Sequence, residues 1–179
     1  MSELPELVID KSAWGDGPWQ TEPDRVDFVA NGFACLLLRH PNHGHWCGYV
    51  GVPREHPAYE RTENYDLDFH GTVNYAAHCS PPICHVPEPG MPDDVWWLGG
   101  DFGRIWDLCP GVASSIGRAH EFIRMVDPIG AAAIEEFEQR VADRKLQRPV
   151  FLRGVYRDVA YVRAETERLA EQLAAMVVA

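Results

Sequence analysis

Three residues between positions 70 and 107, namely His70, Asp101 and Asp107, have side chains that can transfer or direct a proton. An imidazole titrates near neutral pH, while a carboxylate can orient it, activate water or hold a divalent metal ion as a cofactor. Asp101 and Asp107 would lie roughly 20 Å apart on an extended chain, so they share a site only if this glycine-rich segment folds back. The structural alternative is that the aspartates cap turns or helix starts and that His70 is a hydrogen-bonded strand residue.

Arg104 and Trp106 lie between the two aspartates and have side chains suited to holding a substrate. A guanidinium offers a planar fork of donors to a phosphate or carboxylate, and an indole ring can stack on a base or sugar. Tyr75, in the segment HGTVNY, is a third candidate for substrate binding. The structural alternative is that Arg104 pairs with one of the aspartates and that Trp106 is packed in the core, the commoner place for a tryptophan.

Two clusters of histidine and cysteine are weaker candidates for metal binding. The first lies in the segment HCSPPICH and consists of His78, Cys79, Cys84 and His85. Its adjacent His/Cys pairs do not match the spacings of zinc sites, and neighbours on a strand point to opposite faces. In the second cluster, His43 and His45 are two positions apart and could share a face, but the surrounding Pro and Gly favour solvated turn residues.

Hydrophobic patterns predict the strands that would position these residues. The apolar runs FACLLLR and HWCGYVGV, separated by HPNHG, predict a β-hairpin, and Asn31-Gly32 predicts an earlier turn. FACLLL is apolar at every position, as expected for a strand covered on both faces. FHGTVNYA and ICHV predict further strands, and VWWL predicts a buried one with its two tryptophans on opposite faces. The N-terminal stretch predicts a short strand and a wrapping loop held by Trp14 and Trp19.

Two stretches in the C-terminal third have helical periodicity. AAAIEEFEQRVADRKL places Ile134, Phe137 and Val141 on one stripe, and the stretch after Tyr156 repeats apolar residues at steps of three and four. The members of this second stripe are Val159, Val162, Thr166, Leu169, Leu173 and Met176. The stripe spans under three heptads, which favours docking on the sheet. Without internal repeats or linkers, residues 1–179 are predicted to form one α+β domain, with a mostly antiparallel sheet and C-terminal helices packed on one face.

The composition is that of a water-soluble domain with a hydrophobic core. Of 179 residues, 46% are hydrophobic, and the longest apolar run is far shorter than the roughly 20 residues that cross a bilayer. Five cysteines, an odd number, and no basic-then-apolar segment at the N-terminus predict a cytoplasmic location without a disulfide framework. The net charge of -11 without a basic stripe argues against nucleic acid as a partner. We expect no membrane partner, and the oligomeric state is open.

Four segments resemble a known group of proteins. They are GYVGVPREHP (48–57), HGTVNY (70–75), ICHVPEPGMPDDVWWLGGD (83–101) and YRDVAYVRAETERLAEQLA (156–174). Together they are similar to a family of small proteins, carried by bacteriophages and by bacteria, especially actinobacteria, that has no assigned activity. The resemblance therefore implies a phage context and leaves the reaction open.

The pattern of that family is a His-Gly pair followed later by Gly-Phe-Asp-Cys-Ala-His-x-x-Asp. It resembles this chain at His70, Gly71, Asp101 and Asp107. The chain departs from it at Gly100, Phe102 and Arg104, where the family has Phe, Cys and His. If the family histidine is a metal ligand or proton carrier, that role is lost here. If it contacts an anion, Arg104 can replace it.

The polar cluster, set among glycines and aromatic residues beside a buried strand, predicts a small phage-type hydrolase acting on a nucleotide or phosphate-bearing metabolite. His70 would be the general acid or base, with Asp101 and Asp107 positioning water or a metal ion. Arg104 and Trp106 would hold the substrate. One alternative is a non-catalytic phage protein that binds a nucleotide signal or a host defence protein, which the six tryptophans suit. Another is an interaction protein without a small-molecule site.

Overall fold

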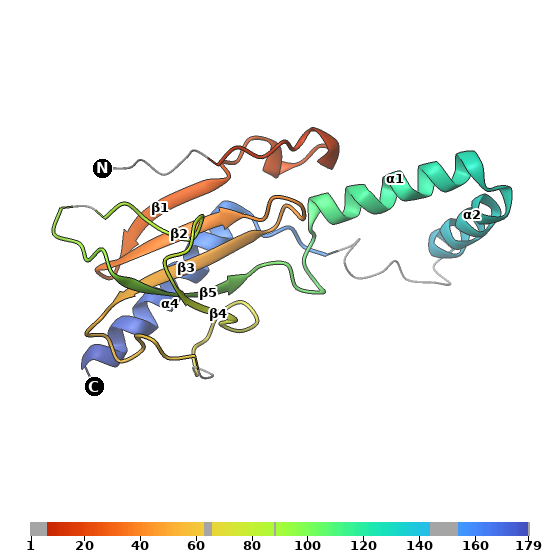
Figure 1. Ribbon diagram of the computed structural model, residues 1–179. Helices are drawn as coiled ribbons and strands as arrows, with labels where there is room; N and C mark the ends of the chain where they lie inside the picture. The colour runs from red at the N-terminus through yellow and green to blue at the C-terminus, as the bar shows by residue number, and fades with distance from the viewer. Residues whose placement is uncertain (1–6, 63–65, 88, 144–153, 179) are drawn as a thin grey trace.

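The fold is built on a five-stranded antiparallel sheet, with a long helix on one face and a helical hairpin projecting from one end (Figure 1). The computed structural model describes residues 7–62, 66–87, 89–143 and 154–178. The strands are β1 (Arg25–Ala30), β2 (Phe33–Arg39), β3 (Trp46–Pro53), β4 (Tyr75–His78) and β5 (Val95–Asp101). Their order is β1-β2-β3-β5-β4, and each neighbouring pair is antiparallel. The predicted α+β class is confirmed.

Both predicted hairpins form. Asn31 and Gly32 join β1 to β2 and have positive φ angles of 51° and 82°, the backbone of the turn that matches the twist of a two-residue hairpin. The register places Ala30 opposite Phe33 across this turn. Residues 40–45 then connect β2 to β3. Every residue of β2 is buried, the apolar run FACLLL as predicted and Arg39 through ion pairs with Glu22 and Asp24.

Replacing Gly32 with alanine is expected to lower the free energy of unfolding by about 1 to 2 kcal/mol, the cost of an L-residue in left-handed backbone. A Cβ there meets no atom within 4 Å, so crowding adds nothing. Gly117 also has open space around an added Cβ but lies inside a helix, where alanine should stabilise by up to about 1 kcal/mol. Urea denaturation of the two variants measures both values, and shifts of the same sign would contradict this interpretation.

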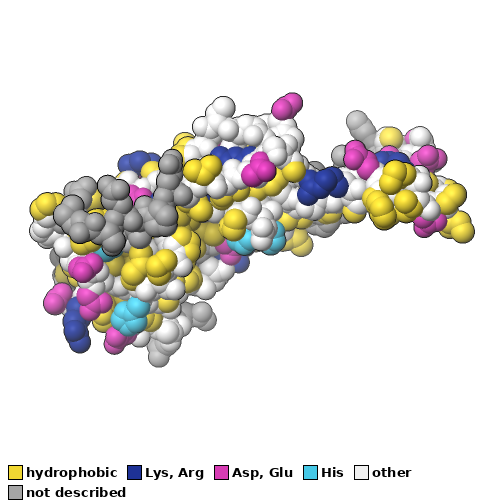
Figure 2. Space-filling model, turned by 45° about the horizontal axis from the view of Figure 1, so that its top comes forward, with side chains coloured by type: hydrophobic (Ala, Val, Ile, Leu, Met, Phe, Trp, Pro, Cys, Tyr) yellow, Lys and Arg dark blue, Asp and Glu magenta, His cyan; other side chains and the backbone are white. Residues whose placement is uncertain are grey.

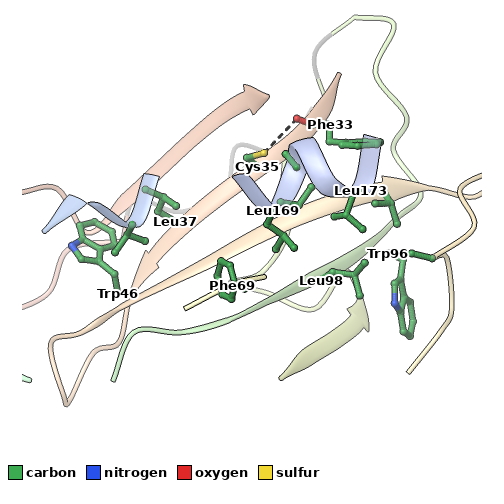
Figure 3. Packing of buried hydrophobic residues seen from close by; sticks show 14 of the residues in the cluster. Phe33, Cys35, Leu37, Trp46, Phe69, Trp96, Leu98, Leu169 and Leu173 are labelled. Atoms are coloured by element: carbon green, nitrogen blue, oxygen red, sulfur yellow. Dashed lines mark hydrogen bonds between the residues drawn. The ribbon is translucent and has the colours of Figure 1, made fainter. Parts of the chain in front are cut away.

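Helix α4 (Val159–Val178) covers one face of the sheet through the predicted stripe. Val162, Thr166, Leu169 and Leu173 have no exposed surface, and the helix packs on β2 and β3. Figure 3 shows Leu169 and Leu173 pointing toward the sheet, in one cluster with Leu98 of β5. The docking of this helix on the sheet is therefore confirmed.

Strand β5 is covered on both faces, as its apolar sequence predicts. Trp96 and Leu98 lie in the cluster beneath α4, whereas Val95 and Trp97 lie in a second cluster on the opposite face. Side chains from the segment before β1 and from the connection between β4 and β5 pack against this second cluster. Loops, rather than helices, therefore cover the second face of the sheet.

The segment before β1 is held in place by two tryptophans. Trp14 ends the 3-10 turn η1 (Ser12–Trp14), and Trp19 lies in η2 (Pro18–Gln20). Both indoles are buried, as predicted. The predicted strand is absent from residues 7–24, where prolines and glycines favour turns over an unbroken ladder of hydrogen bonds.

Helices α1 (Pro110–Val126) and α2 (Pro128–Ala142) form the projecting hairpin. The predicted stripe of Ile134, Phe137 and Val141 is half-buried and faces α1, because Phe137 and Val141 line a groove together with Ile116 of that helix. This stripe therefore serves the hairpin and does not cover the sheet (Figure 1). No helix in the described part of the chain has the length and apolar character that crossing a bilayer requires.

The region from residue 69 to residue 76 contains less strand than its sequence predicts. Strand β4 begins only at Tyr75, and His70 lies in the loop before it. Gly71 turns the chain at this point with a φ of 82°. The interpretation of His70 as a strand residue is therefore wrong, and its side chain is positioned by a loop.

The segment HCSPPICH contains a disulfide. Cys79 and Cys84 are joined, with Cα atoms 4.9 Å apart, and an isolated bridge pairs Ser80 with Ile83 between them. The cysteines at positions 35, 47 and 109 are free. One local disulfide thus closes a tight loop, although the odd cysteine count argued against disulfides.

Candidate functional site

His70 and Asp107 meet in a buried hydrogen-bonded pair. The Asp107 side chain has no exposed surface, and its Oδ2 accepts a hydrogen bond from His70 Nε2 at 2.6 Å. The same oxygen accepts from the backbone N–H of Arg104 at 3.0 Å, and Oδ1 accepts from Arg157 Nε at 2.9 Å. Three donors from three parts of the chain therefore surround one carboxylate, which is how a buried charge is stabilised.

The loop after β5 folds back, as a shared site requires. The backbone N–H of Asp107 donates to the carbonyl of Arg104 at 2.8 Å, which closes a turn. Asp107 is also paired in parallel with Val155, through bonds from Leu108 N to Val155 O and from Val155 N to Trp106 O. These contacts fix Asp107 between the sheet and the chain that enters α4.

The other edge of the His70 ring faces α4. Its Nδ1 lies 3.2 Å from the hydroxyl of Tyr161, and the ring is stacked on Phe102, with centroids 4.8 Å apart and planes 16° apart. The Arg157 guanidinium lies 4.6 Å above the ring of Tyr161. Asp107, His70 and Tyr161 thus form a continuous hydrogen-bonded chain that runs from a closed interior to a half-buried phenol.

Two carboxylates fix the start of α4, and with it the positions of Arg157 and Tyr161. Asp158 accepts from the backbone N–H of Tyr161 at 2.8 Å, an N-terminal cap, and Glu22 accepts from Val159 N at 3.1 Å. Burial alone would raise the pKa of Glu22, but hydrogen bonds from Tyr156 and from the arginine at position 39 outweigh it and lower that pKa. Glu22, in the segment before β1, therefore anchors the start of α4 as an ionised carboxylate.

Asp101 lies beside the pair of His70 and Asp107 but does not join it. Its carboxylate accepts from Asn74 Nδ2 at 2.8 Å and from Gly103 N at 3.0 Å. Burial tends to raise the pKa of Asp101, yet these two hydrogen bonds and the charge of Arg104 lower it below its ordinary value. The Asp101 side chain is 31% exposed, so this is an ionised carboxylate that solvent can reach.

Arg104 connects the two aspartates. Its backbone binds Asp107, while its Nη2 lies 4.0 Å from Asp101 Oδ2 and donates to the carbonyl of Thr72 at 3.2 Å. The guanidinium crosses Gly71, where an added Cβ would come within 2.5 Å of Nε. That Nε is buried and has no hydrogen-bond partner among the residues of known placement.

The two predicted aromatic residues lie in different surroundings. Trp106 is 49% exposed and projects from the loop that carries Asp107, so the alternative of core packing is wrong. Tyr75 is half-buried, and its ring lies 5.1 Å from that of Tyr49, in the cluster on the sheet face opposite α4. Because His70 stacks on Phe102, a member of the cluster beneath α4, the structure does not bring Tyr75 together with His70.

The histidine and cysteine clusters are engaged in other contacts. His78 lies 3.1 Å from Glu60, and its neighbouring cysteine is in the disulfide. In the turn between β2 and β3, the rings of His40 and His43 are stacked with centroids 4.3 Å apart. Within the described ranges, no group of three or more His, Cys, Asp or Glu side chains has the geometry of a metal site.

His45 gives the protein a predicted sensitivity to acid. Its side chain is buried, with Nδ1 3.6 Å from the sulfur of Cys109, and burial lowers its pKa to about 4. In the unfolded chain the pKa is about 6.5, so the unfolded state binds the proton first as the pH falls. We therefore expect the free energy of unfolding to decrease between pH 6.5 and pH 4, by about 3 kcal/mol from this group.

Urea denaturation at a series of pH values tests this contribution. In His45→Gln, an uncharged variant, the decrease between pH 6.5 and pH 4 should be shallower than in the unmodified protein. His43→Gln, at an exposed position in the same turn, serves as the matched control and should retain the steep decrease. Equal slopes in the unmodified protein and His45→Gln would show that burial of this imidazole does not set the acid limit.

Comparisons of the chain with protein-family models, with curated proteins and with solved structures find no match. Function must therefore be argued from the site itself. Two of its side chains, Arg157 and Tyr161, were not predicted from the sequence. Tyr161 lies in the first turn of α4, and Arg157 lies two residues before that helix begins. Nothing local in the sequence indicates that this segment meets His70.

Proposed function

We propose that the site around His70 hydrolyses a nucleotide or a related phosphate-bearing metabolite. The observation that supports the proposal is the series of hydrogen bonds from Asp107 through His70 to the hydroxyl of Tyr161. A buried carboxylate that fixes one ring nitrogen leaves the other to accept a proton and stabilises the imidazolium that results. Proton transfer is therefore the chemistry that this arrangement supports best.

In the proposed reaction, the oxygen of a water molecule forms a bond to phosphorus as the bond from phosphorus to the leaving oxygen breaks. The water gives a proton to the oxygen of Tyr161, whose own proton passes to Nδ1 of His70. The imidazolium pairs with Asp107 and afterwards returns the proton, through Tyr161, to the leaving oxygen. Protons and charge balance without an external reductant or oxidant.

The substrate class is inferred from the side chains around the hydrogen-bonded series of Asp107, His70 and Tyr161. The guanidinium of Arg157 pairs with Asp107 and that of Arg104 lies 4.0 Å from Asp101, so both provide positive charge for a phosphate. Trp106, on the same loop, is exposed and can stack on a base or sugar. Asp101 is ionised and reachable by solvent, which suits a role in positioning water. A phage context for this activity, suggested by the sequence resemblance, is part of the proposal.

A second candidate is a non-catalytic binder that sequesters a nucleotide signal or blocks a host defence protein. It is favoured by the fact that both ring nitrogens of His70 already have hydrogen-bond partners within the protein. The accessible groups are then the half-exposed Trp106 and the arginines, a combination that dominates binding hot spots. In this case His70 and Asp107 only shape the surface.

One experiment separates the two candidates. The purified protein is incubated with nucleoside mono-, di- and triphosphates and with sugar phosphates, while melting temperature, released phosphate and the recovered compound are measured. Phosphate release beyond one equivalent, with an altered compound, supports the hydrolase. A raised melting temperature with intact compound recovered in stoichiometric amount supports the binder. No shift and no release with any compound would overturn the hydrolase and the binder of a nucleotide signal, and would leave only the binder of a host protein.

A further inference from the structure

The connection between β2 and β3, residues 40–45, contains three histidines, and we name it the histidine turn. The ring centroids of His40, His43 and His45 are 4.3 to 5.6 Å apart. Figure 1 shows this connection beside the start of α1, and Figure 2 shows histidine side chains on the surface near the point where the hairpin leaves the body of the protein. The turn therefore lies next to the loop between β5 and α1, residues 102–109, which we name the site loop.

The histidine turn contacts the site loop near both of its ends. Near the first end, the His45 ring lies against Gly103, where an added Cβ would come within 2.7 Å of Nδ1. At the second end, the same Nδ1 lies 3.6 Å from the sulfur of Cys109. The carbonyl of His43 accepts a hydrogen bond from the backbone N–H of Gly111, in the first turn of α1, at 3.0 Å. These contacts hold the segment that supplies Asp107 to the candidate site.

The hydrogen bonds of the turn require neutral imidazoles. His40 Nδ1 accepts from the backbone N–H groups of Asn42 at 3.3 Å and His43 at 3.2 Å. A protonated Nδ1 is a donor, so an imidazolium would lose both bonds and face two other donors. Burial and the neighbouring His43 lower the pKa of His40, and burial lowers the pKa of His45 to about 4. Both rings are therefore neutral at pH 7 while the turn is closed.

The charged groups that face the turn do not reverse this preference. Asp101 of β5 and Asp107 of the site loop favour an imidazolium, but each lies within 4.0 Å of an arginine that offsets its charge. From β2, Arg39 donates to a carbonyl of the turn and is itself paired with two carboxylates. The Cys109 thiol is neutral because burial raises its pKa to about 11. The segment before β1 contributes the uncharged ring of Trp14.

We propose that the histidine turn is a proton-sensitive clasp that regulates the candidate site, because proton uptake by His40 and His45 opens the turn and releases the site loop. The regulation of activity rests on the proposed function, whereas the opening itself does not. In the open turn the two rings are solvated and have an ordinary pKa of about 6.5, which is higher than in the closed turn. The closed turn is therefore fully stable above about pH 6.5 and loses stability as the pH falls toward 4.

Amide hydrogen exchange, followed by NMR at pH 6.5 and pH 5 and corrected for the intrinsic exchange rate, tests the opening. The N–H groups of Asn42, His43 and Gly111 donate within the clasp, and their rates should rise about 10-fold or more, because opening takes up at least one proton. The amide of Val50, buried in the central strand β3, reports global unfolding and should keep its rate. An equal rise at Val50, or unchanged rates at the three clasp amides, would overturn the proposal.

A double variant with His40→Asn and His45→Asn tests whether these two rings take up the protons. Asparagine places an oxygen near the position of Nδ1, so it can accept the same hydrogen bonds, but it does not titrate. The corrected rates at Asn42 and Gly111 should then be equal at pH 6.5 and pH 5. Any loosening by the smaller side chains affects both pH values alike. His78→Gln, at an exposed histidine elsewhere, is the matched control and should keep the 10-fold rise. A rise that persists in the double variant would overturn the assignment to His40 and His45.

Turnover tests the regulation separately from the opening. Between pH 6.5 and pH 5, turnover of the phosphate compound that the protein cleaves should fall less in the double variant than in the unmodified protein. Protonation of His70 is common to both proteins, so it does not produce a difference between them. Equal falls would overturn the regulatory role of the clasp. If the protein cleaves no compound at any pH, the proposed function fails, while the exchange rates still decide whether the clasp opens.

Discussion

Replacing His70 with glutamine is expected to reduce phosphate release by about 100- to 10,000-fold, the range that general acid–base groups contribute. The glutamine amide can still donate a hydrogen bond to Asp107, so the packing of the site is largely retained, but it cannot take up and return a proton. The measurement is turnover of whichever phosphate compound the unmodified protein cleaves. The melting temperature of His70→Gln should stay close to that of the unmodified protein.

Two further variants accompany His70→Gln: one is a control for removing a histidine, and the other tests the path of the proton. His78→Gln removes an exposed histidine that pairs with Glu60, and its turnover should equal that of the unmodified protein. Tyr161→Phe keeps the ring under Arg157 but removes the hydroxyl that meets His70 Nδ1, so turnover should fall while substrate affinity is retained. Full activity in His70→Gln would show that this histidine does not transfer the proton.

The sheet and its covering helix could be predicted because their signals are local. The turn at Asn31 and Gly32 requires residues that tolerate positive φ, and the buried strands are apolar at successive positions. The stripe on α4 recurs with the helical period, so its buried face follows from sequence alone. In each case residues within one element specify both its type and the side that it buries.

The candidate site could be predicted only in part, because its contacts join distant parts of the chain. The prediction that His70 and Asp107 lie close together is confirmed, although 37 residues separate them in the sequence. Arg157, 50 residues beyond Asp107, carries no local signal of its role. Tyr75 follows His70 by only five residues, but it begins β4, and its ring packs in the cluster on the sheet face opposite α4. Nearness in sequence does not specify which face of a sheet a residue occupies, because successive strand side chains point to opposite faces.

The packing partner of the second helix in the projecting hairpin could not be predicted from the sequence either. The periodicity of Ile134, Phe137 and Val141 predicts a helix with one apolar side, and that helix forms. Periodicity does not say which surface this side meets, and here the surface is α1 instead of the sheet. The disulfide between Cys79 and Cys84 was likewise not predicted, because an odd number of cysteines says nothing about a pair five residues apart.

Replacing Asp107 with alanine is expected to lower the free energy of unfolding by about 3 to 5 kcal/mol, the cost of removing one partner from a buried ion pair. The variant leaves His70 without its acceptor in the interior, and Arg157 and the backbone N–H of Arg104 lose theirs as well. Urea denaturation followed by tryptophan fluorescence at pH 7 measures the change. This large effect would exist whether or not the site is catalytic.

Asp101→Ala is the matched control, since it makes the same chemical change six residues earlier. That carboxylate is partly exposed and accepts from Asn74 and Gly103, so its loss should cost only about 1 kcal/mol. A loss below about 1 kcal/mol in Asp107→Ala as well would mean that water replaces the missing carboxylate and that the pocket is open. A large difference between the two variants instead identifies Asp107 as the buried anchor on which the orientation of His70 depends.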